Sequence, residues 1–326
     1  MELIILGSSA AIPVKERNLS SIALKYKDQI IIFDCGEDLQ RQFVAANLKF
    51  NKELRILISH FHGDHIIGLP GLLFRFGLSD RTAPIIIFGP QNLFLYLYVH
   101  RKILGLKAEY PITIIEIDHL NQKLIQYRGL DSDTPIKESP IKNNIIFDSK
   151  YYLLKYTSVE HSVPSFGFAF IEKPRDGKFN PERAIELGIP ESPIWKKLQH
   201  GNITEYNGRK IDPIKQGIVG PKREGRKITY SGDTIPCEAL IELGMNSDIL
   251  VHEATFSKEL EENAIEKKHS TSIDAANVAK RMNAKKLILT HISSRYQEDA
   301  IKLLQEAKKI FPNTILAEDL LKIQIS

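Results

Sequence analysis

The chain contains little cysteine: Cys35 and Cys237 are its only thiols in 326 residues. A disulfide framework needs more, so both thiols are expected to be reduced and the compartment to be the cytoplasm. A secretory signal is not expected, because Glu2 stands where such a signal carries basic residues and the apolar run after it is short. No stretch is long and apolar enough to span a bilayer, so no membrane partner is expected.

A strong excess of either charge is also lacking. Lys and Arg number 44 against 40 Asp and Glu, which gives a formal charge of +4. This mild excess does not establish a nucleic-acid partner, but it allows one if the basic residues cluster. Hydrophobic residues make up 43% of the chain, which is enough to bury a large core.

The order of the apolar runs predicts the fold class. Strand-like runs dominate the first half, and strands and helices alternate after residue 226. This order predicts an α+β fold of two packed sheets with outer helices, a four-layer αββα sandwich. Residues 1–326 are expected to form a single catalytic domain. The expected strands include 3–6, 21–24, 30–33, 54–58, 151–156, 227–230, 249–251 and 287–289, and the expected helices include 38–46, 66–74, 273–282 and 299–310.

One segment departs from this pattern. Residues 172–221 are rich in Pro, Gly, Lys and Glu, and they contain few apolar runs. A linker is the simpler interpretation, but residues 181–187 have a helix-like start and periodicity. We therefore predict an inserted, flexible arm at 172–221, which packs little against the body of the protein.

The strongest chemical signal is the run Ser59-His60-Phe61-His62-Gly63-Asp64-His65, directly after an apolar strand. Alternate residues of an extended loop point the same way, so His60 and His62 can share one metal. Asp64 and His65 can then turn to a second metal, and Gly63 permits the tight backbone path. Imidazole and carboxylate groups suit Zn²⁺, although Mn²⁺, Fe²⁺ or Co²⁺ would also fit.

The pattern His-x-His-x-Asp-His after a strand resembles the metallo-β-lactamase superfamily. His161, Asp233 and His291 also stand near strand ends, in the order that the superfamily shows. The resemblance implies one metal on His60, His62 and His161, and a second on Asp64, His65 and His291. Asp233 would bridge them, which implies two Zn²⁺ per chain.

Further motifs resemble ribonuclease Z, the tRNA 3′-processing endonuclease, over nearly the whole chain. The pieces are individually weak but together specific. They are Pro13-Val14-Lys15-Glu16-Arg17-Asn18, Phe33-Asp34-Cys35-Gly36-Glu37 with Gln40, His252-Glu253-Ala254-Thr255, His269-Ser270-Thr271, and Thr290-His291-Ile292-Ser293-Ser294-Arg295-Tyr296. The chain departs from the family at Asp38-Leu39, where Gly-Thr is usual, and at Ser192-Pro193, where Gly-Pro is common.

This resemblance implies a zinc-dependent endoribonuclease that removes the 3′ trailer of precursor tRNA, leaving a 3′-hydroxyl and a 5′-phosphate. Asp64 is expected to accept a proton from the attacking water, and His269, oriented by Glu253, to donate to the phosphate or leaving oxygen. Lys15 and Arg17 are expected to bind RNA phosphates. The family also implies a homodimer, with the arm as a tRNA-binding element.

Two other functions compete with this one. A hydrolase of the same fold could act on a small phosphodiester, sulfate ester or thioester, and it would not need the arm or the Lys15 loop. An RNA-binding protein with an inactive site is a second alternative, but the complete set of ligand-type residues argues against it.

Overall fold

The computed structural model describes residues 1–325, which divide into two compact units. The first unit comprises residues 1–148 and 154–170 and the chain from Lys227 onward. The second comprises residues 149–153 and 171–226, a longer stretch than the arm predicted at 172–221. Among residues 1–325, no helix is both long and apolar enough to cross a membrane.

The first unit contains a sheet of nine strands. Their order across the sheet is β20 (Lys322–Gln324), β1 (Glu2–Gly7), β3 (Ser21–Tyr26), β4 (Gln29–Phe33), β5 (Glu53–Leu57), β6 (Ile85–Pro90), β7 (Ile112–Asp118), β8 (Lys123–Arg128) and β9 (Lys137–Pro140). Strands β4 to β7 run parallel to one another, and their neighbours on both sides are antiparallel. The parallel strands are nearly continuous in apolar residues, as expected where a sheet is covered on both faces.

A second sheet has seven strands. Their order is β10 (Ile145–Asp148), β11 (Tyr152–Val159), β12 (Ser165–Glu172), β15 (Lys227–Tyr230), β16 (Ile249–Glu253), β17 (Leu287–Thr290) and β19 (Thr314–Leu316). The last four are parallel. A two-stranded parallel sheet of β2 (Ser9–Ala10) and β18 (Ile292–Ser293) joins the segments that follow β1 and β17.

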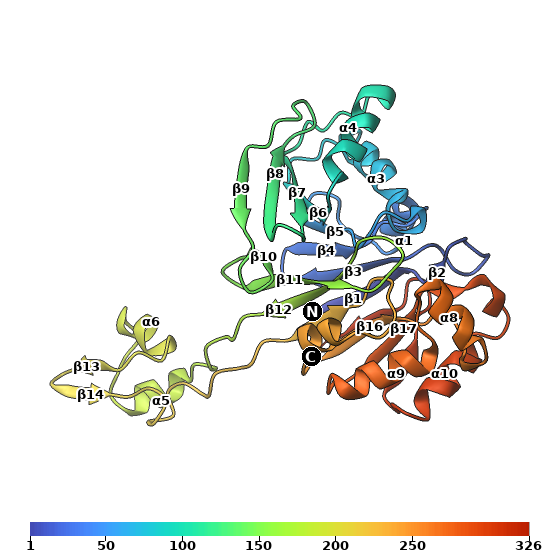
Figure 1. Ribbon diagram of the computed structural model, residues 1–326. Helices are drawn as coiled ribbons and strands as arrows, with labels where there is room; N and C mark the ends of the chain where they lie inside the picture. The colour runs from blue at the N-terminus through green and yellow to red at the C-terminus, as the bar shows by residue number, and fades with distance from the viewer. Residues whose placement is uncertain (326) are drawn as a thin grey trace. The chain divides into compact units, whose positions relative to one another are not determined.

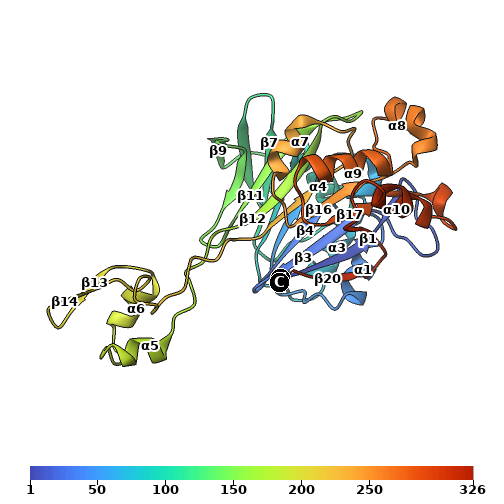
Figure 2. The same cartoon turned by 90° about the horizontal axis from the view of Figure 1, so that it is seen from below.

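Helices cover the outer faces of the two large sheets (Figure 1). On the first sheet they are α1 (Leu39–Ala45), α3 (Gly68–Gly77) and α4 (Leu93–Leu104), and on the second α7 (Glu238–Gly244), α9 (Ser272–Arg281) and α10 (Ile301–Lys308). Figure 2 shows α9 and α10 along strands β16 and β17. Helix α9 begins with a capping box, in which Thr271 and Asp274 bond each other's backbone amides. These layers confirm the predicted αββα sandwich.

The parallel strands explain where polar residues gather. Parallel neighbours end at the same edge of a sheet, so residues that follow them in the chain meet there. Asp34 and Ser59 follow β4 and the apolar run of β5, while Asp233 and His291 follow β15 and β17. Gly232, at φ 61°, permits the turn to Asp233, because a Cβ there would lie 2.7 Å from the Phe166 carbonyl oxygen.

The segment expected to be an extended loop is partly helical. A short helix, α2 (Gly63–Ile66), begins directly after His62, so Asp64 and His65 lie on a helical turn. Gly63 does not adopt a left-handed conformation; instead, a Cβ there would lie 2.8 Å from the Ile67 side chain. Only His60 and His62 follow the side-chain alternation predicted for an extended loop. The helical turn sets the directions of the Asp64 and His65 side chains.

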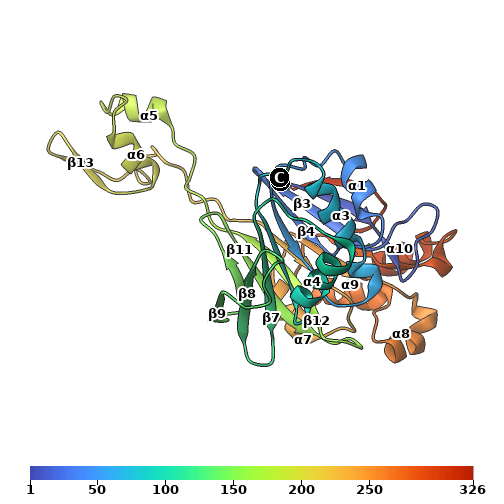
Figure 3. The ribbon, with the colours of Figure 1, turned by 90° about the horizontal axis from the view of Figure 1, so that it is seen from above.

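The second unit contains α5 (Pro181–Glu186), α6 (Ile194–Gln199) and the hairpin of β13 (Thr204–Tyr206) and β14 (Arg209–Ile211) (Figure 3). The predicted helix start is confirmed, because the Asn180 side chain accepts a hydrogen bond from the Arg183 amide. Sequence patterning underestimated its apolar content. Ala184, Ile189, Leu198, Ile211, Ile218 and Val219 form a small core of the unit's own, against which Trp195 packs.

Candidate metal centre

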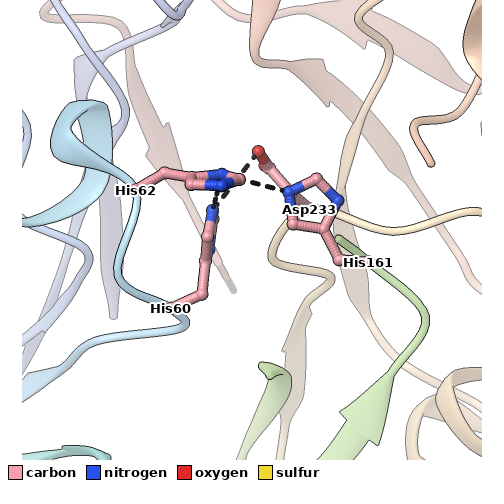
Figure 4. A group of neighbouring side chains, drawn as sticks. All are labelled: His60, His62, His161 and Asp233. Carbon is pink, nitrogen blue, oxygen red and sulfur yellow. Dashed lines mark hydrogen bonds and ion pairs between the residues drawn. The ribbon is translucent and has the colours of Figure 1, made fainter. Parts of the chain in front are cut away.

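Three imidazoles and one carboxylate converge where β5, β11 and β15 end. His60 Nε2 lies 3.1 Å from His62 Nδ1, and His161 Nε2 lies 3.2 Å from the same atom. The Asp233 carboxylate reaches within 3.7 Å of His60 Nε2. Figure 4 shows these four side chains pointing toward one another, and their ligand atoms all lie within 4.8 Å. The arrangement can hold one metal ion.

A second group lies beside the first. Asp64 Oδ2 lies 3.3 Å from His291 Nε2 and 3.6 Å from His65 Nε2, and the two imidazole nitrogens are 3.2 Å apart. Asp233 Oδ2 is also 3.2 Å from His65 Nε2 and 3.3 Å from His291 Nε2. Asp233 therefore faces both groups, as a bridging ligand must.

The chemistry of these residues fits divalent cations. The other oxygen of Asp233, Oδ1, is buried and has no hydrogen-bond partner among residues 1–325. A buried carboxylate oxygen is costly to leave unpaired, and a cation is the partner that the surrounding imidazole nitrogens could share with it. Carboxylate and imidazole donors are the usual ligands of zinc and similar ions.

The buried carboxylate of Asp34 orients two of these imidazoles. Its Oδ2 accepts hydrogen bonds from His65 Nδ1, Ser59 Oγ and Tyr230 Oη, each at 2.7 Å, and its Oδ1 accepts from the Ser59 amide. Because the Ser59 hydroxyl proton points to Asp34, its oxygen can accept from His60 Nδ1, 2.9 Å away. Both imidazoles consequently direct Nε2 toward the cluster.

The buried carboxylate of Glu253 orients two other imidazoles, those of His269 and His291. Its Oε1 accepts from His269 Nδ1 at 2.8 Å and from the Thr234 amide at 2.9 Å. Its Oε2 accepts from Thr255 Oγ1, whose oxygen lies 2.9 Å from His291 Nδ1. One carboxylate thus fixes His269 directly and His291 through a hydroxyl, and neither ring uses Nε2 in these contacts.

The carboxylates also set the charge of the cluster. Burial alone lowers the pKa of His65, but Asp233 and Asp34 outweigh it and raise the pKa well above its usual value. Burial also lowers the pKa of His269, and Glu253 outweighs it, so the pKa rises to about 9. For His60 burial prevails, and the pKa falls. The carboxylates therefore favour positive charge on His65 and His269, and the same interaction favours bound cations.

The two residues predicted to bind RNA have different environments in the structure. The Lys15 side chain is 85% exposed. Arg17 is engaged in the fold: its Nη1 donates to Ser8 Oγ at 2.8 Å and to the Ala317 carbonyl. Burial lowers the pKa of Arg17, and the charge of Asp319 partly opposes this. Lys15 is thus the residue of this pair with a side chain open to a substrate.

Several positioning residues were quoted in sequence motifs without a role. Asp34, Ser59 and Thr255 belong to this group, and Tyr230 was seen only as part of a strand. The available signal was position, because each is a polar residue at or just after the end of an apolar strand. A cavity of about 670 Å³ opens beside the cluster, and His62, Asp64, Asp233, His269 and His291 contribute to its wall.

Sequence comparisons agree with this geometry. Residues 1–128 match the family described as anti-Pycsar protein Apyc1, and residues 200–292 match the β-lactamase superfamily domain. The chain is 40% identical over 322 residues to ribonuclease Z of Archaeoglobus fulgidus, covering 98% of this chain and 96% of that protein. It is 36% identical over 325 residues to ribonuclease Z of Methanosarcina mazei, covering 100% and 98%. The chain belongs to the ribonuclease Z family.

Solved structures extend this assignment. The short form of human tRNase Z matches with a TM-score of 0.67 at 26% identity, covering 100% of both chains. The metallo-β-lactamase fold protein YhfI of Bacillus subtilis matches at 15% identity with a TM-score of 0.64, covering 99% of both chains, and shows the fold alone. The ribonuclease Z family member described here therefore has the metallo-β-lactamase fold, as its motifs predicted.

Asp34→Asn tests the orienting role of this carboxylate. An amide carries no charge and can accept only through one oxygen, so we expect zinc affinity to fall about 10- to 100-fold. Titration against a competing chelator measures this. Asp80→Asn is the control, because Asp80 is an exposed aspartate with a similar positive φ, 48° against 57°. Equal affinity in both folded variants would show that Asp34 does not orient the ligands.

Proposed function

We propose that this protein is an endoribonuclease that cleaves precursor tRNA at its 3′ end and removes the 3′ trailer. The tRNA would keep a 3′-hydroxyl and the trailer a 5′-phosphate. The observation that carries this proposal is the pairing of His269 with Glu253 beside a complete metal-ligand set, in a chain that matches ribonuclease Z proteins over its full length. Small-ester hydrolysis would not require the second unit or the Lys15 loop.

We propose that each chain binds two divalent ions. Zinc is the preferred candidate, and Mn²⁺, Fe²⁺ and Co²⁺ are the others. His60, His62 and His161 would hold one, Asp64, His65 and His291 the other, with Asp233 shared. Such ions lower the pKa of bound water and offset charge on phosphoryl oxygens.

Asp64 is suited to accept the proton of the attacking water. Burial raises its pKa, but His291 and His65 outweigh this and lower it, so the carboxylate is ionised at neutral pH. Its Oδ2 also accepts a hydrogen bond from the Ala11 amide at 2.7 Å, which fixes its orientation. The side chain remains in contact with the cavity, where a water can reach it.

His269 is suited to donate a proton or hydrogen bond to the substrate. Its Nδ1 proton is committed to Glu253, so this nitrogen is not available as a metal ligand. With a pKa of about 9, the ring also carries a proton on Nε2 at neutral pH. This proton can reach the scissile phosphate or the leaving oxygen in the cavity that His269 lines.

Two regions would hold the RNA. Lys15 offers an exposed ammonium, and Arg17 would act by fixing the loop that carries Lys15. In the second unit, the arm, Lys196 and Lys197 on α6 are exposed and make no ion pair among residues 1–325, as is also true of Arg209 and Lys210 on β14. Other charges in this unit pair internally, such as Arg183 with Glu186. The unpaired cations of the arm are proposed phosphate contacts, together with Lys15, whose exposed ammonium lies 3.5 Å from Glu16 Oε1.

We also propose a homodimer in the cytoplasm. Helix α4 exposes Leu95, Val99 and Ile103, which are spaced four residues apart and form an apolar stripe along one face. A second copy of the chain would cover such a stripe. Cys35 and Cys237 are both free and buried, which suits a reducing compartment.

Cleavage of a precursor tRNA tests the proposal directly. The purified protein should release the trailer and should lose this activity in a chelator, and elemental analysis should approach two divalent ions per chain. Asp64→Ala should abolish turnover and reduce occupancy of the second site. Cleavage that persists in protein shown to contain no metal would refute the proposed chemistry.

His269→Ala should lower kcat about 10²- to 10⁴-fold, the usual range for one positioned acid or base, while metal content stays normal. Glu253→Gln should lower the pKa of His269, because it removes the charge that raises it. Since the acid is active only when protonated, the alkaline loss of kcat should begin at lower pH. If His269→Ala releases metal instead, the residue is a ligand and this role is wrong.

Lys196→Ala/Lys197→Ala should raise KM for precursor tRNA about 10-fold with kcat nearly unchanged, since remote contacts act on substrate capture. Lys308→Ala/Lys309→Ala is the control, because it removes two consecutive exposed lysines at the end of α10 in the first unit. Hydrolysis of bis(p-nitrophenyl) phosphate should be the same in both. Equal KM values of the two double variants for precursor tRNA would show that Lys196 and Lys197 of the arm do not bind the RNA.

A further inference from the structure

A second cavity borders the histidine run, because Phe61 contributes to its wall. Its volume is about 320 Å³, at the lower end of the range of about 300–1,000 Å³ for ligand sites. It is lined by Phe61, Pro90, Gln91, Asn92, His119, Val163 and Pro164. Phe61 stands between His60 and His62 in the chain, and Val163 follows His161 by two residues. This cavity is therefore built on the same segments that carry one set of metal ligands.

Two aromatic rings in the wall of this cavity, Phe61 and His119, pack against neighbouring rings. The Phe61 ring packs edge-on against Tyr96, with centroids 6.1 Å apart. The His119 ring packs edge-on against the fully buried Phe166, at 5.6 Å. Both rings are only partly buried. No lysine, arginine, aspartate or glutamate lines the cavity, so it is not built for a phosphate or a free cation.

The cavity is also lined by two side-chain amides, Gln91 and Asn92, that make no hydrogen bond within residues 1–325. Asn92 precedes α4 and has φ 76°, but its side chain does not cap the helix. Glu116 does so instead, accepting from the Phe94 amide at 2.9 Å. Gln91 and Asn92 are exposed, and neither side-chain amide has a hydrogen-bond partner among residues 1–325. Each can donate and accept at the same time.

We propose that this cavity binds an unpaired nucleobase that adjoins the scissile phosphate. A base is a flat aromatic ligand with donors and acceptors along one edge, which matches aromatic walls and free amides. Proteins recognise RNA sequence mainly at unpaired ends and loops, where bases can leave the stack. Because neighbouring Cα atoms are about 3.8 Å apart, a base against Phe61 belongs to a nucleotide close to the metal ligands His60 and His62. This inference rests on the proposed nuclease function and assigns the site a base specificity.

The first test is a set of precursor tRNAs, each with one abasic nucleotide among the unpaired positions on either side of the cleavage point. One abasic position should lower kcat/KM of the wild-type protein about 5- to 150-fold, as for one lost base–aromatic contact. Phe61→Leu and Asn92→Gly should each lower kcat/KM on the intact precursor. On that abasic precursor, the same substitutions should cost nothing further, because the contact is already missing.

Asn92→Gly is the cleaner variant, because glycine adopts the positive φ of this position without strain. Asn47→Gly is its control, since Asn47 is also exposed with φ 55° and lines none of the cavities described above. Hydrolysis of bis(p-nitrophenyl) phosphate should be equal in Asn92→Gly, Asn47→Gly and the wild type. The proposal would be overturned if, at every abasic position, the fold-loss in kcat/KM from the substitution multiplied the fold-loss from the missing base.

A binding measurement gives an independent readout. 2-Aminopurine placed at the sensitive position should change its fluorescence on binding the wild-type protein in chelator, where no cleavage occurs, as it leaves one stacked environment for another. Phe61→Leu and Asn92→Gly should reduce this change, and Asn47→Gly should not. If the intact precursor is cleaved but no abasic position matters, only this inference fails. If the intact precursor is not cleaved at all, the nuclease proposal fails with it.

Discussion

The site depends on one buried carboxylate, Asp34, which accepts hydrogen bonds from residues of both sheets. It follows β4 with φ 57°, a conformation that aspartate tolerates better than most residues. From this position it accepts from Ser59 after β5 and from Tyr230 at the end of β15 in the second sheet. It also accepts from His65. The same group thus links the two sheets and fixes the direction of the ligand nitrogens.

Glu253 repeats this design with different elements. Each carboxylate binds one imidazole directly and a second through a hydroxyl, Ser59 in one case and Thr255 in the other. Such partners fix the tautomer and the ring orientation, so little reorganisation is needed when a cation binds. His291 is held at φ 56°, and the hydrogen bond that its Nδ1 donates to Thr255 Oγ1 helps to keep it in this strained conformation. His269 shares the design, but its outer nitrogen faces the substrate cavity.

Strand ends could be predicted from sequence, whereas the contacts between them could not. Apolar runs before His60, Asp233 and His291 marked parallel strands, and the parallel arrangement brings their ends together. Strand β8 and the edge strands β9 and β20 were missed because they are rich in polar residues. In addition, β20 is defined by pairing with β1, for example Gln324 with Glu2, at the far end of the chain. The role of Asp34 was missed because it depends on three elements meeting. The arm's small core was missed because its apolar residues are scattered in sequence.

Anomalous X-ray diffraction at the zinc edge, on crystals of the metal-loaded protein, tests the central claim most directly. The account predicts two peaks per chain. One should lie among His60, His62 and His161 and the other among Asp64, His65 and His291, with Asp233 in contact with both and His269 with neither. A single peak, or a peak bound by His269 in place of one of these ligands, would contradict it.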